Sequence, residues 1–198
     1  MSLVVNSVGG KAGFIAKASI RFAVKENKVS VWYPFAKSVA LYPTTTAIWT
    51  RERVYTFAET QDQAARYAQW MLSEGILPGE LVAMCLMNSS EFLIIWLAIL
   101  SIGCSAAFLN YNLEGKALLH CLDVCETKLI IADDDAGCRA RIEGVRGEIE
   151  KKGKKVMFLD DALQQKISAT KAIVPGDEYR KDVNGDLPCC LIYTRYCG

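Results

Sequence analysis

The chain of 198 residues is long enough for one ordinary domain, or for one and a fraction. Hydrophobic residues make up 52% and charged residues 23%, which is typical of globular proteins and excludes a largely disordered chain. The formal net charge of +1 gives no electrostatic reason to expect nucleic-acid binding.

Residues 1–46 are predicted to form a segment of their own, basic at its start and aromatic toward its end. Residues 14–24 (FIAKASIRFAV) can form a helix with its cations on one side, as in helices that lie on anionic membrane surfaces. The alternative is a cationic, partly ordered segment with no membrane role. Residues 28–46 suggest a short helix followed by a turn. The basic residues that precede the first acidic one are Lys11, Lys17, Arg21 and Lys25.

Residues 47–57 (AIWTRERVYTF) predict two short strands joined by a charged turn at 51–53. Thr56 and Glu59 have the spacing of a capping box, which predicts a helix that runs to about Glu74 and ends at Gly75. Apolar residues recur at helical spacing within it and predict a buried stripe. They are Ala64, Tyr67, Ala68 and Met71.

From residue 82 onward, short apolar runs alternate with capped helical patterns. The helical patterns cover 91–102, 113–124, 135 to about 152, and a short stretch from 161. This alternation predicts an α/β fold with a mainly parallel sheet flanked by helices. The predicted strands are Val82–Met87, Ala106–Leu109, Lys128–Ala132, Lys155–Leu159 and Cys189–Tyr193. In the last of them, Leu191 to Tyr193 are predicted to be buried.

The longest uncharged run, Phe92–Leu109, has 18 residues, which is the lower limit for a helix that spans a membrane. Glu91 lies directly before it, and Gly103 together with two serines interrupts it. We therefore predict a buried helix that ends near Gly103 and is followed by a buried strand at Ala106–Leu109.

Two groups of residues could in principle bind metal. Asp133, Asp134 and Asp135 are adjacent, but acidic residues are also favoured at a helix amino terminus, and we predict that they cap a helix. His120, Cys121 and Cys125 lack a fourth zinc ligand at suitable spacing. The eight cysteines form no CxxC pair and lie mostly in apolar segments, which predicts reduced, buried thiols. The prediction for metal ligands is therefore none.

Several stretches resemble one known family. They are residues 47–92, beginning AIWTRERVYTF and ending NSSEF, then WLAILSIG at 96–103, NYNL at 110–113, LLHCL at 118–122, CRARIE at 138–143, PGDEYRK at 175–181 and LPCCLIYT at 187–194. Together they resemble the amino-terminal part of the adenylate-forming (AMP-binding) superfamily. Within it they are most similar to the fatty acid transport protein, or very-long-chain acyl-CoA synthetase, branch and its fungal members. The resemblance covers about residues 47–194, so we expect residues 47–198 to form a partial AMP-binding domain, an incomplete amino-terminal subdomain of that fold.

The resemblance implies ATP-dependent activation of a long or very long fatty acid to acyl-CoA, with ATP, Mg²⁺ and CoA as cofactors and a link to fatty-acid uptake. In the family, a strand ending in Tyr-Thr leads into the loop Ser-Gly-Thr-Thr-Gly, which wraps the phosphates of ATP. Tyr193 and Thr194 match the start of this loop, and we predict them as cofactor-binding residues. Arg195, Tyr196 and Cys197 then stand where Ser, Gly and Thr are expected.

Because of this departure, the expectation is a front portion of such an enzyme, with no catalytic residues of its own and no activity alone. The alternative is a non-catalytic module of the same ancestry that binds a membrane or a protein partner. No nucleic-acid partner is expected. By resemblance, the location would be intracellular, with membrane association at the endoplasmic reticulum, peroxisome, lipid droplet or plasma membrane.

Overall fold

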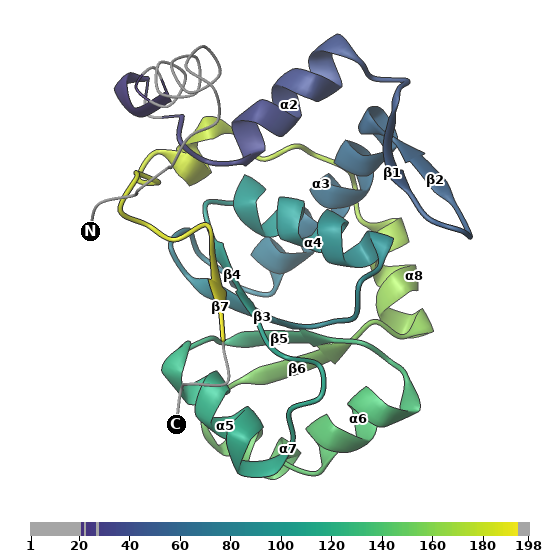
Figure 1. The fold of residues 1–198 in the computed structure, drawn as a ribbon, viewed down its shortest axis with the longest axis vertical. Coiled ribbons are helices and arrows are strands. Elements are labelled where there is room, and N and C mark those ends of the chain that lie inside the picture. The colour runs from purple at the N-terminus through teal and green to yellow at the C-terminus, as the bar shows by residue number, and fades with distance from the viewer. Residues whose placement is uncertain (1–20, 22, 27, 194–198) are drawn as a thin grey trace, which may run out of the picture.

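The computed structural model describes residues 21, 23–26 and 28–193, and in them helices surround a central sheet (Figure 1). The prediction for residues 14–24 falls largely outside the described residues and stays a prediction. The helices are α2 (Trp32–Leu41), α3 (Phe57–Ser73), α4 (Ser90–Ser101), α5 (Gly115–Val124), α6 (Ala136–Glu143), α7 (Arg146–Lys151) and α8 (Asp161–Ala169), with a 3₁₀ turn, η1 (Asp177–Arg180). The strands are β1 (Thr46–Trp49), β2 (Val54–Thr56), β3 (Leu81–Cys85), β4 (Ser105–Phe108), β5 (Leu129–Ala132), β6 (Lys155–Phe158) and β7 (Cys190–Ile192).

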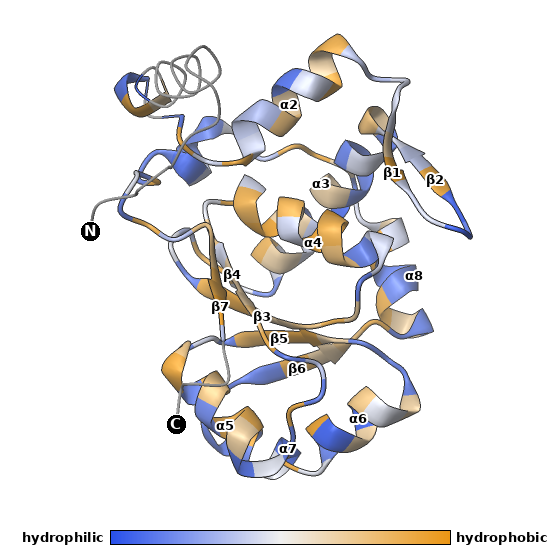
Figure 2. Cartoon of the chain, in the orientation of Figure 1, coloured by the Kyte–Doolittle hydropathy of each residue, from blue (hydrophilic) through white to orange (hydrophobic). Residues whose placement is uncertain are grey.

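Strands β3 to β7 form a parallel sheet in the order β6-β5-β3-β4-β7. This confirms the predicted α/β class, and each predicted strand is present with its ends shifted by a few residues. The central strand β3 is nearly all buried, as its uninterrupted apolar run predicts (Figure 2). Alternate residues of the strands supply two separate hydrophobic clusters, one on each face of the sheet.

The two faces are covered by different helices. Helices α2, α3, α4 and α8 pack on one face, and α5, α6 and α7 on the other (Figure 1). In α3, the predicted stripe of Ala64, Tyr67, Ala68 and Met71 is buried in the first cluster. Each face therefore has its own core, and β3, β4 and β5 contribute to both.

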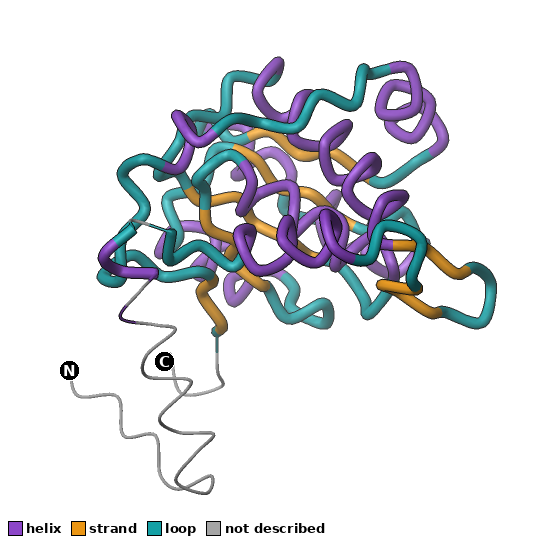
Figure 3. Tube along the Cα trace, turned by 90° about the horizontal axis from the view of Figure 1, so that it is seen from above, coloured by secondary structure: helices purple, strands orange, loops and turns teal. Residues whose placement is uncertain are grey.

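The predicted hairpin is present, with Ile48 opposite Tyr55 and Trp49 opposite Val54. The predicted capping box is confirmed as well, since the Glu59 backbone N–H donates to Thr56 Oγ1 over 3.2 Å and the Thr56 N–H donates to Glu59 over 2.8 Å. Figure 3 shows the hairpin extending from one side of the body, away from the central sheet.

The apolar run 92–109 is divided as predicted. Helix α4 ends at Ser101, Gly103 adopts φ +72°, and β4 begins at Ser105. A Cβ atom at Gly103 would lie 2.0 Å from the carbonyl oxygen of Tyr179, so both the conformation and the close approach require glycine. Within the described residues, no helix is long and apolar enough to cross a membrane.

Two local predictions are wrong. The helix predicted from Asp135 to about Lys152 is broken at Gly144 and Val145 into α6 and α7. The break has a packing reason, because it lets Val145 be buried together with Ile142 and Ile149 against the sheet.

The second error concerns the last strand. Leu191 to Tyr193 read as buried, but β7 is the edge strand beyond β4, and the Ile192 side chain is 69% exposed. An apolar run alone does not distinguish a central strand from an edge strand.

Candidate functional site

The carboxyl ends of the parallel strands meet at one edge of the sheet, where α/β proteins generally bind ligands. The loop after β3 leads to α4 on one face, whereas the loops after β4 and β5 lead to α5 and α6 on the other. Chain segments therefore diverge at β3. A cavity of about 440 Å³ lies at this divergence, lined by Leu86, Met87, Asn88, Tyr111 and Asn112.

Tyr111 and Asp135 form the best-defined polar contact at this edge. The Tyr111 hydroxyl donates to Asp135 Oδ2, and the Arg141 guanidinium lies over the Tyr111 ring, 4.7 Å from its centroid. The hydrogen bond raises the pKa of Tyr111 to about 12 and lowers the pKa of Asp135. Tyr111 is therefore a neutral hydrogen-bonding group at neutral pH and is not a general base.

The side chains of the three adjacent aspartates each make a contact that stabilises the fold. Asp135 Oδ1 accepts from the backbone N–H groups of Gly137 and Cys138 and caps α6, which confirms the predicted capping role for this residue. Asp134 pairs with Arg139. Asp133 accepts from the Met87 backbone N–H over 2.5 Å, and burial raises its pKa.

The aspartates are thus committed to three different partners. No group of three metal-ligating side chains occurs among residues 21, 23–26 and 28–193. The polar side chains that line the cavity, among the described residues, are two amides and a phenol.

Tyr193, the first of the two predicted cofactor-binding residues, lies at the same edge. Tyr193 directly follows β7, which pairs with β4, and it packs half-buried against the cluster on the α5 face. Thr194 lies outside the described residues. Ile192 pairs with Phe108, so the chain leaves β7 next to the segment that carries Asn110 and Tyr111.

Sequence reasoning missed Tyr111, which it named only as part of the resembling stretch NYNL at 110–113. The signal was present, because polar residues directly after a predicted parallel strand lie at the ligand-binding edge. The contacts with Asp135 and Arg141 join residues 24 and 30 positions apart in sequence, which no local pattern indicates.

The predicted buried thiols are confirmed for Cys85, Cys104, Cys121, Cys125 and Cys138, whereas Cys189 is exposed and Cys190 half-buried. Cys138 Sγ lies 3.9 Å from Cys85 Sγ, beneath the carboxyl edge. The hydrogen bond that Cys85 shares with Cys138, together with burial, raises the pKa of Cys85, which makes it a poor nucleophile.

Comparison with known proteins decides the family. Residues 35–194 match the model of the AMP-binding enzyme family. The chain belongs to this family. It is 34% identical over 143 residues to a very long-chain fatty acid transport protein of Cochliobolus heterostrophus, covering 72% of this chain and 22% of that one. It is also 34% identical over 124 residues to isopenicillin N epimerase component 1 of Hapsidospora chrysogena, covering 62% and 20%.

Solved structures agree on the fold. A fatty acyl CoA synthetase of Mycobacterium tuberculosis superposes with a TM-score of 0.75 at 20% identity, covering 86% of this chain and 33% of that one. At this identity the likeness shows the fold alone. The chain spans about a fifth of the length of the curated relatives named above.

Proposed function

We propose that this chain is the front portion of an ATP-dependent fatty acid–CoA ligase of the fatty acid transport protein branch. The observation that carries the proposal is the family match over residues 35–194, which ends where Tyr193 and Thr194 lead out of β7. The relative from Cochliobolus heterostrophus, a very long-chain fatty acid transport protein, supports a long acyl chain as substrate. ATP, Mg²⁺ and CoA would be the cofactors of the whole enzyme.

In this proposal the described residues position the phosphate loop. Parallel pairing with β4 directs the chain out of β7 at the edge of the sheet that also carries Asn88 and Tyr111. The side-chain amides of Asn88 and Asn112 in the lining can donate hydrogen bonds to a polar ligand without bringing a net charge, whereas the Tyr111 hydroxyl already donates to Asp135. A neutral donor set suits a ligand whose own phosphates are balanced by Mg²⁺ and by cations elsewhere in the enzyme.

We further propose that the 198-residue polypeptide alone forms no acyl-CoA and exchanges no pyrophosphate into ATP. Arg195, Tyr196 and Cys197 replace the small residues that the family uses around phosphate. Losing one preorganised donor to a developing charge commonly costs ~10²–10³ in rate. Several such groups would be missing here.

The test uses two chimeras, each joining residues 1–194 to the corresponding downstream region of the Cochliobolus heterostrophus relative. One carries Ser-Gly-Thr-Thr-Gly after Thr194, and its matched control of equal length carries Arg-Tyr-Cys-Thr-Gly, which places Arg, Tyr and Cys where the first has Ser, Gly and Thr. Acyl-CoA formation from a long-chain fatty acid is expected for the first and should be at least ~100-fold slower for the second. Equal rates in the two chimeras, or pyrophosphate exchange by the unmodified chain, would contradict the proposal.

The alternative is a non-catalytic module that binds a membrane through residues 14–24. Its support is the run of cations at 11, 17, 21 and 25 before any acidic residue. Each cation near an anionic surface contributes about 1 kcal/mol. Liposome co-sedimentation should then fall with rising salt and with Lys17→Glu plus Arg21→Glu, whereas binding that ignores both changes would exclude this role.

A further inference from the structure

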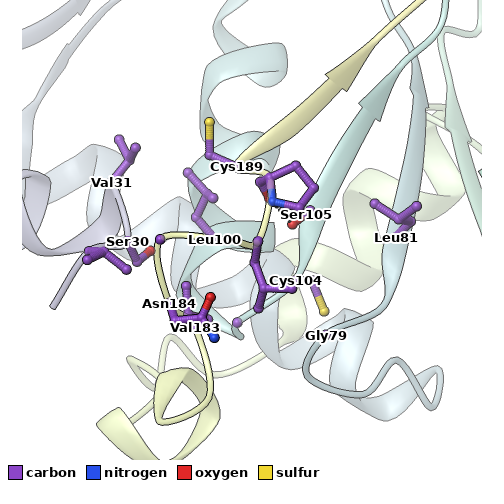
Figure 4. Close-up of a pocket in the computed structure, with 15 residues that line it drawn as sticks. Ser30, Val31, Gly79, Leu81, Leu100, Cys104, Ser105, Val183, Asn184 and Cys189 are labelled. Carbon is purple, nitrogen blue, oxygen red and sulfur yellow. Dashed lines mark hydrogen bonds between the residues drawn. The ribbon is translucent and has the colours of Figure 1, made fainter. Parts of the chain in front are cut away.

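A second cavity lies at the amino ends of the strands, at the opposite edge of the sheet from Tyr111 and Tyr193. It has a volume of about 440 Å³ and is lined where β3, β4 and β7 begin, at Leu81, Ser105 and Cys189 (Figure 4). Cavities of roughly 300–1,000 Å³ are the usual size for small-ligand sites. We propose that this cavity binds a neutral, apolar small molecule, such as an uncharged alkyl chain or an aromatic bicycle.

The described residues that line the cavity are mostly apolar, and none of them carries a charged side chain. Leu100 and Cys104, which are 4% and 3% exposed, come from the end of α4 and the turn after it. Val31 and Leu187 also line the cavity, and their side chains remain 41% and 45% exposed. An apolar ligand would remove this surface from water, which contributes about 25 cal/mol per Å².

Three polar side chains of the lining, and the amide oxygen of Asn184, already have partners within the protein. The Cys104 thiol donates to the Leu77 carbonyl over 3.1 Å, and the Ser105 hydroxyl donates to the Pro188 carbonyl. Ser30 Oγ accepts from the Trp32 backbone N–H over 3.3 Å. A charged ligand would therefore lose its hydration without gaining an ion pair, which is costly in an apolar site.

The wall formed by residues 183–189 is anchored at both ends, so the cavity is preformed. Before it, the buried Arg180 donates to the carbonyl oxygens of Ser101 and Pro175. After it, Ser105 holds Pro188 and β7 pairs with β4. Because residues 183–189 are already held in place, ordering them would cost little free energy when a ligand binds.

The experiment measures binding of N-phenyl-1-naphthylamine, a neutral fluorescent probe, to the full chain without ATP or CoA. Val183→Trp places a larger side chain in the lining and should weaken binding at least fivefold. Val174→Trp is the matched control, because Val174 is 43% exposed and does not line the cavity. 1-Decanol should displace the probe at least tenfold better than decanoate, which has the same chain length with an anionic head.

A second readout does not depend on the variants. Cys189 lines the cavity and its thiol is exposed, whereas the neighbouring Cys190 does not line it. The bound probe should slow alkylation of Cys189 by N-ethylmaleimide and leave Cys190 unchanged, as read by peptide mapping. If Val183→Trp does not fold, protection of Cys189 in the unmodified chain tests the proposal by itself, and absence of protection would overturn it. No saturable binding, equal weakening by both tryptophan variants, or decanoate competing as well as decanol would each overturn the proposal.

Discussion

Glu74, the residue that caps the carboxyl end of α3, offers a quantitative test of how the first face of the sheet is held together. Its carboxylate pairs with Lys155 at the start of β6 and with Lys166 of α8, the latter over 2.6 Å, and accepts from Trp70 Nε1 over 3.0 Å. The side chain is only 11% exposed. The hydrogen bonds from Lys155 and Lys166 lower the pKa of Glu74 from 4.5 to about 2.

The magnitude follows from this pKa. Because each pKa unit corresponds to ~1.4 kcal/mol, the lowering is equivalent to about 3 kcal/mol at most. Both lysine side chains are 53% exposed, so solvent screening reduces the expected value to about 1–2 kcal/mol. A carboxyl group with a lowered folded pKa stabilises the protein above its unfolded pKa of 4.5, and this stability is lost as the pH falls toward about 2.

Glu74→Gln should therefore lower the free energy of unfolding by about 1–2 kcal/mol at pH 7, and more than half of this difference should be gone at pH 3. Urea denaturation followed by tryptophan fluorescence at both pH values measures it. Glu148→Gln is the control, because Glu148 is exposed and should change stability by less than ~0.5 kcal/mol. A Glu74→Gln variant as stable as the unmodified chain at pH 7, or one equally destabilised at pH 7 and pH 3, would refute the reasoning.

Three further substitutions test separate parts of the fold by urea denaturation. Gly103→Ala should lower the free energy of unfolding by over ~3 kcal/mol, because its Cβ would lie 2.0 Å from the Tyr179 carbonyl oxygen. Its control is Gly153→Ala, where φ is a similar +70° but a Cβ would meet nothing within 4 Å, and this variant should lose only about 1 kcal/mol. Thr56→Ala removes a confirmed cap and should cost about 1 kcal/mol, and no loss would argue against the capping box. Arg180→Met leaves buried carbonyl groups unpaired and should lower the free energy of unfolding by about 3 kcal/mol. Proteolysis within residues 175–189 should also become faster, and an unchanged rate of proteolysis would contradict the anchoring role of Arg180.

The parts of the fold that sequence predicts are those specified by neighbouring residues. The capping box lies within four residues, and Gly103 marks the end of α4 because few other residues adopt its backbone conformation. The apolar run of β3 predicts a strand covered on both faces, and the strand is indeed central. The order of strands in the sheet cannot be predicted in this way, because an apolar run does not indicate which strands will pair with it. The prediction that β7 is buried is wrong for this reason.

The candidate site shows the same limit more strongly. The sequence placed Tyr193 at the carboxyl edge because the strand before it was predictable, but it gave no sign that Tyr111 contacts both Asp135 and Arg141. Arg180 is a similar case. An arginine is expected at the surface, yet it is 3% exposed. Besides Asp177, its hydrogen-bond partners are the backbone carbonyls of Ser101 and Pro175, which carry no sequence signal.

The two ends of the sheet differ in chemistry in a way that follows from the connections between strands. At the carboxyl edge the chain diverges to both faces after β3, which leaves polar loop residues such as Asn88 and Tyr111 around an open cavity. At the amino edge, residues 183–189 cross back to reach β7, and those of them that line the cavity, such as Val183 and Leu187, are uncharged. Among the described residues, a polar ligand therefore finds amide donors at the first edge, and an uncharged apolar one finds a mostly apolar surface at the second. Because β3, β4 and β7 run through both, Gly103→Ala should disturb the apolar cavity directly and the polar edge only through loss of folding.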